Sequence, residues 1–278
     1  MTQPRERIAW INGEFLPASR AVISIRDAGL VYGDSVFDTA RTFNGKLFRL
    51  EEHIERLYRS LASTLIDPGM EPGKMMSVTE ELVARNLPML RQGEDFWVTQ
   101  RITTGQQKLD GEAPVREGAT IAIDCIPVPL RARARFFRDG INTVVAERRR
   151  ISPDALSANI KTNNYLNMML AQREVNQDHP GAWALMRDQH GNIAEGAGCN
   201  FFIVEGERVV TPRAEFILEG ISRQVVMEIC QREGIQLEEA DFDIDRAEAA
   251  DESFFTSTSL CICPVGRLNN RTFDAIPG

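Results

Sequence analysis

Three groups of residues in the second half of the chain carry side chains and backbone groups that can do chemistry. Lys161 is the only basic residue between Ser152 and Gln172, and Glu195 begins a glycine-rich run. The turn Gly220-Ile221-Ser222 precedes a segment with helical apolar spacing. The start of a helix offers backbone N–H groups, a hydroxyl and the positive end of the helix dipole, which together bind anions.

An amine, a carboxylate and an anion site are the three groups that pyridoxal phosphate requires of a protein. The amine bonds covalently to the cofactor, the carboxylate keeps the pyridine nitrogen protonated, and the anion site binds the phosphate. A desolvated lysine loses its proton more easily, which suits imine chemistry at Lys161. Taken singly, Lys161 reads as a surface residue, Glu195 as a turn residue and Ser222 as a helix cap. Their combination in this order favours a pyridoxal-phosphate site.

Composition limits the classes of protein to which the chain can belong. Its 278 residues predict one or two domains, and 43% hydrophobic and 26% charged residues are ordinary for a globular protein. A net charge of −8 argues against nucleic acid as the main partner. No apolar run approaches the roughly 18 residues of a membrane helix, and the N-terminus lacks the apolar core of a signal peptide. Five cysteines without a disulfide framework favour reduced thiols and a cytoplasmic protein.

The residues that could bind a metal ion show no ligand spacing. His53, His179 and His190 lie far apart in the sequence. Cys261-Ile262-Cys263 has no second ligand pair, and the alternating residues of a strand explain it better. We therefore predict no metal site.

The first half of the chain mixes strand and helix patterns. A helix is predicted where Leu50, Ile54, Leu57, Leu61 and Leu65 share one face. The other patterns predict, in chain order, a hairpin at 8–16, a short strand at 21–25, a loop at 27–34, a strand at 35–43, a helix at 76–90, strands at 96–102 and 119–126, and a polar loop at 103–118. A loop that long in a compact domain is often functional.

The second half begins with a change of composition. Residues 127–138 start as Pro-Val-Pro-Leu and then carry four arginines, which favours an exposed, extended connector. After it come predicted strands at 141–146, 182–186, 237–242 and 253–257, a hairpin of 200–204 with 208–211, a helical turn at 247–250, and helices at 163–176 and 221–233. We expect the 163–176 helix to bury Leu166, Met169, Leu170 and Val175. Mixed elements without strict alternation predict an α+β fold, with domains at 1–126 and 139–278 joined by the connector 127–138.

The residues around Glu195 resemble a known family signature. Glu195, Asn200-Phe201-Phe202, Thr211 and Gly220-Ile221-Ser222-Arg223 follow one another in the order found in class IV aminotransferases, which are fold-type IV pyridoxal-phosphate enzymes. That family includes branched-chain and D-amino acid aminotransferases, aminodeoxychorismate lyases and (R)-selective amine transaminases. The resemblance extends along nearly all of the chain. It implies a two-domain fold, pyridoxal 5'-phosphate as cofactor, and transfer of an amino group in two half-reactions.

The resemblance also implies a role for individual residues. Lys161 is the catalytic lysine and Glu195 the partner of the pyridine nitrogen. His53-Ile54-Glu55-Arg56-Leu57 resembles the helix whose arginine binds the cofactor phosphate, and we carry that role to Arg56. The remaining cofactor-binding residues implied are Tyr165 at the ring hydroxyl, and Gly220, Ile221, Ser222 and Thr258 at the phosphate.

Substrate-binding residues are expected in the first half. Tyr32 and Phe37 resemble the family's substrate pocket, and Arg41, Arg101 and Lys108 are candidates for binding a substrate carboxylate because their cationic groups pair with one. Small-molecule amino donors and keto acceptors are the partners that the family implies, and the subunits are expected to form a homodimer.

The branched-chain type is the favoured subgroup, because Arg41 follows Val36-Phe37-Asp38 as an arginine follows the corresponding strand in that type. Two features depart from that type: Thr99 replaces its usual tyrosine, and Tyr165 lies four residues after Lys161, as in the D-amino acid type. Yet the loop at 105–111 lacks the Arg-x-His of the D-amino acid type. D-amino acid and (R)-amine transaminases therefore remain alternatives, and an aminodeoxychorismate-type lyase is a further one.

Overall fold

The structure is a computed structural model that describes residues 6–107, 110–111 and 117–274. By its internal contacts the chain divides into two compact units. The first unit comprises Met1–Val128 and Ile160–Asn164, and the second comprises Pro129–Asn159 and Tyr165–Gly278. The domains predicted from the sequence were continuous ranges, so they did not assign the short segment Ile160–Asn164 to the first unit. Each unit is described by itself.

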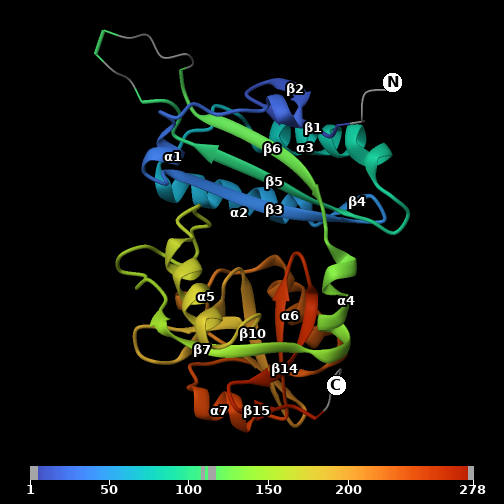
Figure 1. The fold of residues 1–278 in the computed structure, drawn as a ribbon, viewed down its shortest axis with the longest axis vertical. Helices are drawn as coiled ribbons and strands as arrows, with labels where there is room; N and C mark the ends of the chain where they lie inside the picture. Colours follow the sequence, from blue (N-terminus) through green and yellow to red (C-terminus); the bar gives the residue numbers. More distant parts are fainter. Residues whose placement is uncertain (1–5, 108–109, 112–116, 275–278) are drawn as a thin grey trace. The chain divides into compact units, whose positions relative to one another are not determined.

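The first unit is an antiparallel sheet of six strands in the order β2-β1-β6-β5-β3-β4 (Figure 1). Its strands are β1 (Ile8–Ile11), β2 (Glu14–Pro17), β3 (Ser35–Phe43), β4 (Lys46–Phe48), β5 (Phe96–Thr103) and β6 (Thr120–Pro127). Its helices are η1 (Ala18–Arg20), α1 (Ala28–Val31), α2 (Leu50–Thr64), α3 (Pro72–Asn86) and η2 (Leu87–Met89).

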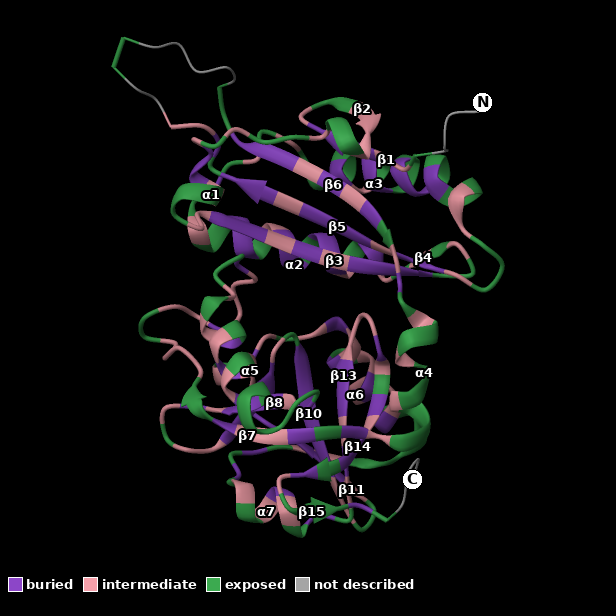
Figure 2. Ribbon diagram, in the orientation of Figure 1, coloured by how far each residue is buried: buried purple, intermediate pink, exposed green. Residues whose placement is uncertain are grey.

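One face of this sheet packs against α2 and α3. The predicted stripe of α2 supplies Ile54, Leu57 and Leu61, which are buried with Val36 and Ala40 of β3 in one hydrophobic core. Alternation along the strands sends every second side chain to this core and the others to the opposite face. The buried bands along β3, β5 and β6 are visible in Figure 2. The opposite face carries the side chains considered below.

Two predictions for the first unit are wrong. Residues 21–25 do not form a strand, and Val22 and Ile25 are 74% and 83% exposed. The predicted loop at 27–34 contains α1, because the Asp27 carboxylate accepts a hydrogen bond from the Gly29 N–H and caps the helix. The other predicted strands and helices of this unit are present, with ends that differ by a few residues.

The second unit is a mixed sheet of nine strands in which β9 pairs with both β8 and β10. The strands from β10 through β13, β14, β7, β8 and β9 therefore close into a ring. The strands are β7 (Ile141–Arg149), β8 (Trp183–Arg187), β9 (Ile193–Gly196), β10 (Cys199–Glu205), β11 (Arg208–Thr211), β12 (Gln236–Glu239), β13 (Glu252–Ser257), β14 (Cys261–Leu268) and β15 (Arg271–Thr272). The helices are α4 (Leu130–Asp139), α5 (Leu166–Asp178), η3 (Ala214–Phe216), α6 (Ile221–Glu233) and α7 (Ile244–Ala249).

Alternate residues of the ring strands form separate cores. Phe201, Phe255 and Cys263 belong to one core, whereas Phe202 and Phe254 lie with Val226 and Cys230 of α6 in another. The hairpin of β10 and β11 is present as predicted, and Cys261, Ile262 and Cys263 alternate along β14. Cys125, Cys199, Cys230 and Cys263 are buried free thiols. The helices and mixed strands of the two units confirm the α+β assignment from the sequence.

Two predictions for the second unit are corrected by the structure. The segment 127–138 is not extended, because most of it forms the helix α4. The helix predicted at 163–176 begins at Leu166 and buries Met168, Ala171 and Val175, while Leu166 and Met169 are 64% and 41% exposed. Four of the five residues from Leu166 to Leu170 are apolar, so either of two sides of the helix could face the core. The sequence pattern alone did not identify the side that is buried.

Within the described part of the chain, no helix is long and apolar enough to cross a membrane. The same residues contain no group of three side chains placed to hold a metal ion.

Candidate active site

Lys161 lies in a short segment that extends the sheet of the first unit. The Phe37 N–H donates to the Lys161 carbonyl at 2.9 Å, and the Asn163 N–H donates to the Ser35 carbonyl at 3.1 Å. These bonds pair Lys161 with Phe37 on the edge of β3. The Lys161 N–H also donates to Ser60 Oγ of α2 at 3.1 Å. The backbone of the lysine is therefore fixed by residues distant in the sequence.

Three side chains form a row across the open face of this sheet. Phe37 lies opposite Arg101 of β5 on one side and opposite Lys161 on the other. Residues opposite each other in antiparallel strands point to the same face. Accordingly, Lys161 Nζ lies 4.6 Å from the centre of the Phe37 ring. The structure thus brings together the predicted lysine, the predicted pocket aromatic and one predicted carboxylate-binding arginine.

On the other face, Asp38 holds Arg56 and His53 in a buried cluster. Arg56 Nε and Nη2 each donate to Asp38 at 2.8 Å, and His53 Nδ1 lies 2.7 Å from Asp38 Oδ1. Burial would raise the pKa of Asp38, but Arg56 and His53 outweigh it and hold that pKa far below its usual range. Burial lowers the pKa of His53 despite the nearby carboxylate. At neutral pH the cluster therefore contains an ionised aspartate, a charged arginine and a neutral histidine that donates from Nδ1.

Glu195 is buried in the second unit at the end of β9. Its side chain is 3% exposed, and Oε1 lies 2.9 Å from Arg150 Nη2. Oε2 accepts from the Leu218 N–H at 3.1 Å and, at 3.5 Å, from Asn200 Nδ2. Arg150 gives the carboxylate a cationic partner.

Asn200 connects this carboxylate to the start of α6. Its Nδ2 also donates to the Leu218 carbonyl at 2.8 Å. A Cβ at Gly220 would overlap Asn200 Oδ1, so a larger residue there would force the Asn200 side chain to move. The helix begins at Ile221 as predicted, with Gly220 at the N-cap and no side-chain cap, which leaves its first N–H groups for an anion. Ser222 lies in the first turn and is not the cap.

The other signature residues support this arrangement. Thr211 Oγ1 donates to the Phe201 carbonyl at 3.0 Å. Arg223 is buried, donates to the Pro212 carbonyl at 3.0 Å and forms an ion pair with Glu239. The Arg223 contacts tie the start of α6 to the residue after β11 and to the end of β12, and the Thr211 contact joins β11 to β10, so the signature is largely a scaffold.

A buried hydroxyl next to this region fits an anionic ligand. Thr256 is 1% exposed, and its Oγ1 has no hydrogen-bond partner among the described residues. Thr256 is the strand partner of Asn200, which touches Gly220. An orphaned hydroxyl beside a helix start is a donor set that a phosphate would satisfy. The predicted phosphate residue Thr258 lies in the turn between β13 and β14, two residues further along.

The remaining predicted residues lie in varied places. Tyr32 is 68% exposed, and its hydroxyl accepts from Gln107 Nε2 at 2.6 Å. Tyr165 precedes α5 and packs against the core that contains Ala146. Lys108 lies outside the described residues.

The structure gives Arg41 a role other than the expected one. It is 5% exposed, lies over the Phe43 ring at 4.1 Å, and has Nη2 3.8 Å from Asp95. Arg41 is also four residues beyond Phe37, or roughly 13 Å along an extended strand. We therefore remove Arg41 from the expected carboxylate-binding residues.

Sequence reasoning missed Asp38, Ser60 and Arg150 as contacts of the site. Asp38 was visible only as part of the resemblance, and Arg150 is one of three consecutive arginines with nothing to distinguish it. Asn200 was identified as part of the family signature, but its contacts with Glu195 and Leu218 were not predicted.

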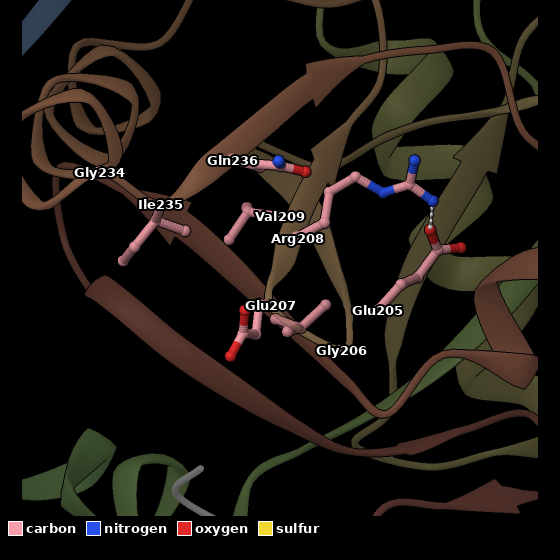
Figure 3. Close-up of a pocket in the computed structure, with 9 residues that line it drawn as sticks. Glu205, Gly206, Glu207, Arg208, Val209, Gly234, Ile235 and Gln236 are labelled. Carbon is pink, nitrogen blue, oxygen red and sulfur yellow. Dashed lines mark hydrogen bonds and ion pairs between the residues drawn. The ribbon is translucent and has the colours of Figure 1, made fainter.

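A pocket of about 790 Å³ lies elsewhere in the second unit, at the β10–β11 hairpin (Figure 3). Its lining includes Glu205 and Arg208, which form an ion pair at 2.6 Å, and Arg246 also binds Glu205. These pairs hold the pKa of Glu205 at about 2. None of the predicted site residues lines this pocket, so it is not the candidate active site.

Comparison with known proteins gives consistent results. The family Amino-transferase class IV matches residues 35–268. The "Putative branched-chain-amino-acid aminotransferase" of Methanocaldococcus jannaschii is 34% identical over 95% of this chain and 89% of its own length. The D-alanine aminotransferase of Bacillus licheniformis is 29% identical over 95% of this chain and 89% of its own length.

A solved structure is similar to this chain along nearly its whole length. The branched-chain aminotransferase from the thermophilic archaeon Thermoproteus uzoniensis, solved with norvaline, has a TM-score of 0.85 and 26% identity, over 98% of this chain and 91% of that chain.

Proposed function

We propose, from the premise that this chain belongs to the class IV aminotransferase family, that it transfers an amino group between an amino acid and a 2-oxo acid with pyridoxal 5'-phosphate. The family match covers most of the chain, from residue 35 to residue 268. The observation that carries the proposal is the buried Glu195, which Asn200 and Leu218 link to the uncapped start of α6. A carboxylate and an anion-binding helix start are what the ring nitrogen and the phosphate of this cofactor need.

When bound, the cofactor supplies a ring that withdraws electrons from the substrate α-carbon. Lys161 would hold the cofactor through its amine, and after the amine of the substrate takes that place the released Nζ would carry a proton as a general acid and base. Glu195 keeps a proton at the ring nitrogen, and Arg150 holds the Glu195 carboxylate in an ion pair. The first N–H groups of α6 bind the phosphate together with the residues predicted for it, Arg56, Gly220, Ile221, Ser222 and Thr258. Tyr165 contacts the ring hydroxyl.

On the substrate side, Phe37 and Arg101 flank Lys161 on the open face of the first unit. Phe37 restricts the position of the amine, because Nζ lies over its ring. Arg101 binds a substrate carboxylate, and Tyr32 and Lys108 complete the substrate site.

We favour a branched-chain amino acid as donor, because the relative at 34% identity and the solved neighbour are named for that activity. A D-amino acid is the alternative, supported by the similarity to D-alanine aminotransferase and by the spacing from Lys161 to Tyr165. An (R)-amine donor and a lyase reaction are further alternatives.

The homodimer and the cytoplasmic location belong to this proposal. Val22, Ile25, Leu30 and Val31 are 74%, 83%, 60% and 45% exposed in a short stretch of the first unit. Clustered exposed apolar side chains mark interaction surfaces, and a second copy of the chain would cover them. An Ile25→Lys, Leu30→Lys variant should therefore run as a monomer in size-exclusion chromatography with light scattering, whereas the parent protein runs as a dimer. The free cysteines suit a reducing compartment.

The test is amino transfer by the protein loaded with pyridoxal phosphate. L-leucine, D-alanine and (R)-1-phenylethylamine are offered in turn, each with 2-oxo-4-methylpentanoate or 2-oxoglutarate as acceptor. Lys161→Ala should lose turnover and the visible absorbance of the loaded protein, whereas Lys74→Ala, an exposed lysine of α3, should keep both. Turnover retained in Lys161→Ala would contradict the proposal. Product formation without any 2-oxo acid would support the lyase reaction instead.

A further inference from the structure

Asn159 lies two residues before Lys161 and uses both ends of its side-chain amide. Its Nδ2 donates to the Ala214 carbonyl at 3.2 Å, and its Oδ1 accepts from the Glu219 N–H at 3.2 Å. Ala214 begins η3 and Glu219 precedes the N-cap of α6. An amide that donates at one end and accepts at the other is fixed in both position and orientation. Asn159 therefore bridges the two ends of the segment 214–219.

The segment 214–219 also contains the backbone groups that contact Glu195 and Asn200. The Leu218 N–H donates to Glu195 Oε2 at 3.1 Å, and the Leu218 carbonyl accepts from Asn200 Nδ2 at 2.8 Å. These bonds do not involve Asn159, and all of these residues belong to the second unit. Removing the amide of Asn159 would therefore leave the contacts of Leu218 in place.

After Asn159 the chain passes from the second unit to the first. Asn159 is the last residue of the second unit before Ile160–Asn164, the lysine segment, which packs with the first unit. There the Lys161 N–H donates to Ser60 Oγ, and the Lys161 carbonyl accepts from the Phe37 N–H. Two residues of extended chain span at most about 7 Å, so the α-carbon of Lys161 stays within that distance of the Asn159 α-carbon. The amide of Asn159 thus fixes the point at which the lysine segment begins.

We infer that Asn159 is a positioning residue for Lys161, whose two hydrogen bonds anchor the start of the lysine segment. This inference rests on the proposed function. Lys161 must reach the cofactor with its amine and stay close enough to carry a proton after release, and both steps depend on a fixed position. A segment that is ordered before the cofactor arrives also loses less entropy on binding. Without the amide, the segment keeps its bonds to Ser60 and Phe37 but loses its anchor in the second unit.

Pyridoxal phosphate and pyridoxamine phosphate separate the lysine from the rest of the site. The Lys161 amine condenses with the aldehyde of pyridoxal phosphate, so a C=N bond replaces the C=O bond and one water is released. Pyridoxamine phosphate has an amine in place of the aldehyde and forms no bond to the lysine, although its ring and phosphate are the same.

The test is a fluorescence titration of the protein with each compound. Asn159→Leu, which keeps the size of the side chain and removes both hydrogen bonds, should weaken binding of pyridoxal phosphate by about 10-fold. Binding of pyridoxamine phosphate should change by less than about 2-fold. Asn159→Asp keeps the acceptor for the Glu219 N–H and should weaken pyridoxal phosphate by about 3-fold. The aspartate variant gives the same comparison should the leucine variant fail to fold.

Two controls separate this effect from a loss of structure. In a Lys161→Ala background, which removes the bond to the cofactor, Asn159→Leu should change the affinity for pyridoxal phosphate by less than about 2-fold. Asn176→Leu removes an exposed asparagine of α5 that accepts from the Gly181 N–H at 3.2 Å, and it should leave both affinities unchanged.

Equal weakening of both compounds, or a loss that persists in the Lys161→Ala background, would mean that Asn159 only supports the segment 214–219. Either result, or unchanged affinities in both Asn159 variants, would overturn the inference and leave the transaminase proposal standing. Failure of the unmodified protein to bind either compound would overturn the proposed function and this inference with it.

Discussion

Replacing Asp38 by asparagine tests the buried cluster of Asp38, Arg56 and His53 directly. Asp38 is fully buried, and its two oxygens take two hydrogen bonds from Arg56 and one from His53. Asparagine keeps the size of the side chain but removes its charge. The change leaves the Arg56 guanidinium buried without its anion.

The expected loss of stability follows from that unpaired charge. Removing one partner of a buried ion pair costs about 3–5 kcal/mol, because the other charge stays desolvated. The asparagine oxygen still accepts one hydrogen bond, so we expect the lower end, about 3 kcal/mol. A domain with a total stability of about 5–15 kcal/mol would be strongly affected by such a loss.

The assay is urea unfolding followed by circular dichroism, for Asp38→Asn, Arg56→Met and the double variant. Replacing both partners by uncharged groups is often nearly neutral, so the double variant should be more stable than the sum of the single losses predicts, by about 2 kcal/mol. A loss below about 1 kcal/mol for Asp38→Asn, or strict additivity in the cycle, would refute this account of the cluster.

The same variant tests the proposed role of Arg56 at the phosphate. Asp38 binds Nε and Nη2 of Arg56 and so fixes the orientation of the guanidinium. Fluorescence titration should therefore show about 10-fold weaker binding of pyridoxal phosphate and little change for pyridoxal, which lacks the phosphate. Equal weakening of both would point to a purely structural role.

Three further predictions follow from the same contacts. Glu195→Gln should slow turnover by about 100-fold, since an amide cannot keep the ring nitrogen protonated, while cofactor affinity measured by titration changes little. Gly220→Ala should destabilise the protein by about 1–3 kcal/mol in urea unfolding, because the added Cβ would overlap Asn200 Oδ1. The lowered pKa of His53 means that the unfolded chain binds a proton below its ordinary pKa of 6.5 while the folded chain does not. Stability should therefore fall as pH drops from 7 to 5.5, and less so in His53→Asn; identical slopes would contradict this.

Local patterns in the sequence predicted much of this protein. The apolar stripe of α2, the hairpin of β10 and β11, and the start of α6 at Ile221 each depend on residues close together in the chain. The order of residues from Glu195 to Arg223 predicted the family before any comparison. The phase of α5 was wrong because four of its first five residues are apolar. Short-range patterns fix which element forms, and an ambiguous run leaves the buried side undecided.

Only the tertiary structure determined which partners the site residues have. Backbone pairing with β3 places Lys161 beside Phe37, although the two are far apart in the sequence. Register between strands sets Asp124 against Arg101, and folding of the ring sets Arg150 against Glu195, while Arg41 turns to Asp95. A sequence gives the charge of each side chain, but the charge that pairs with it depends on strand register and packing, which are long-range properties of the fold.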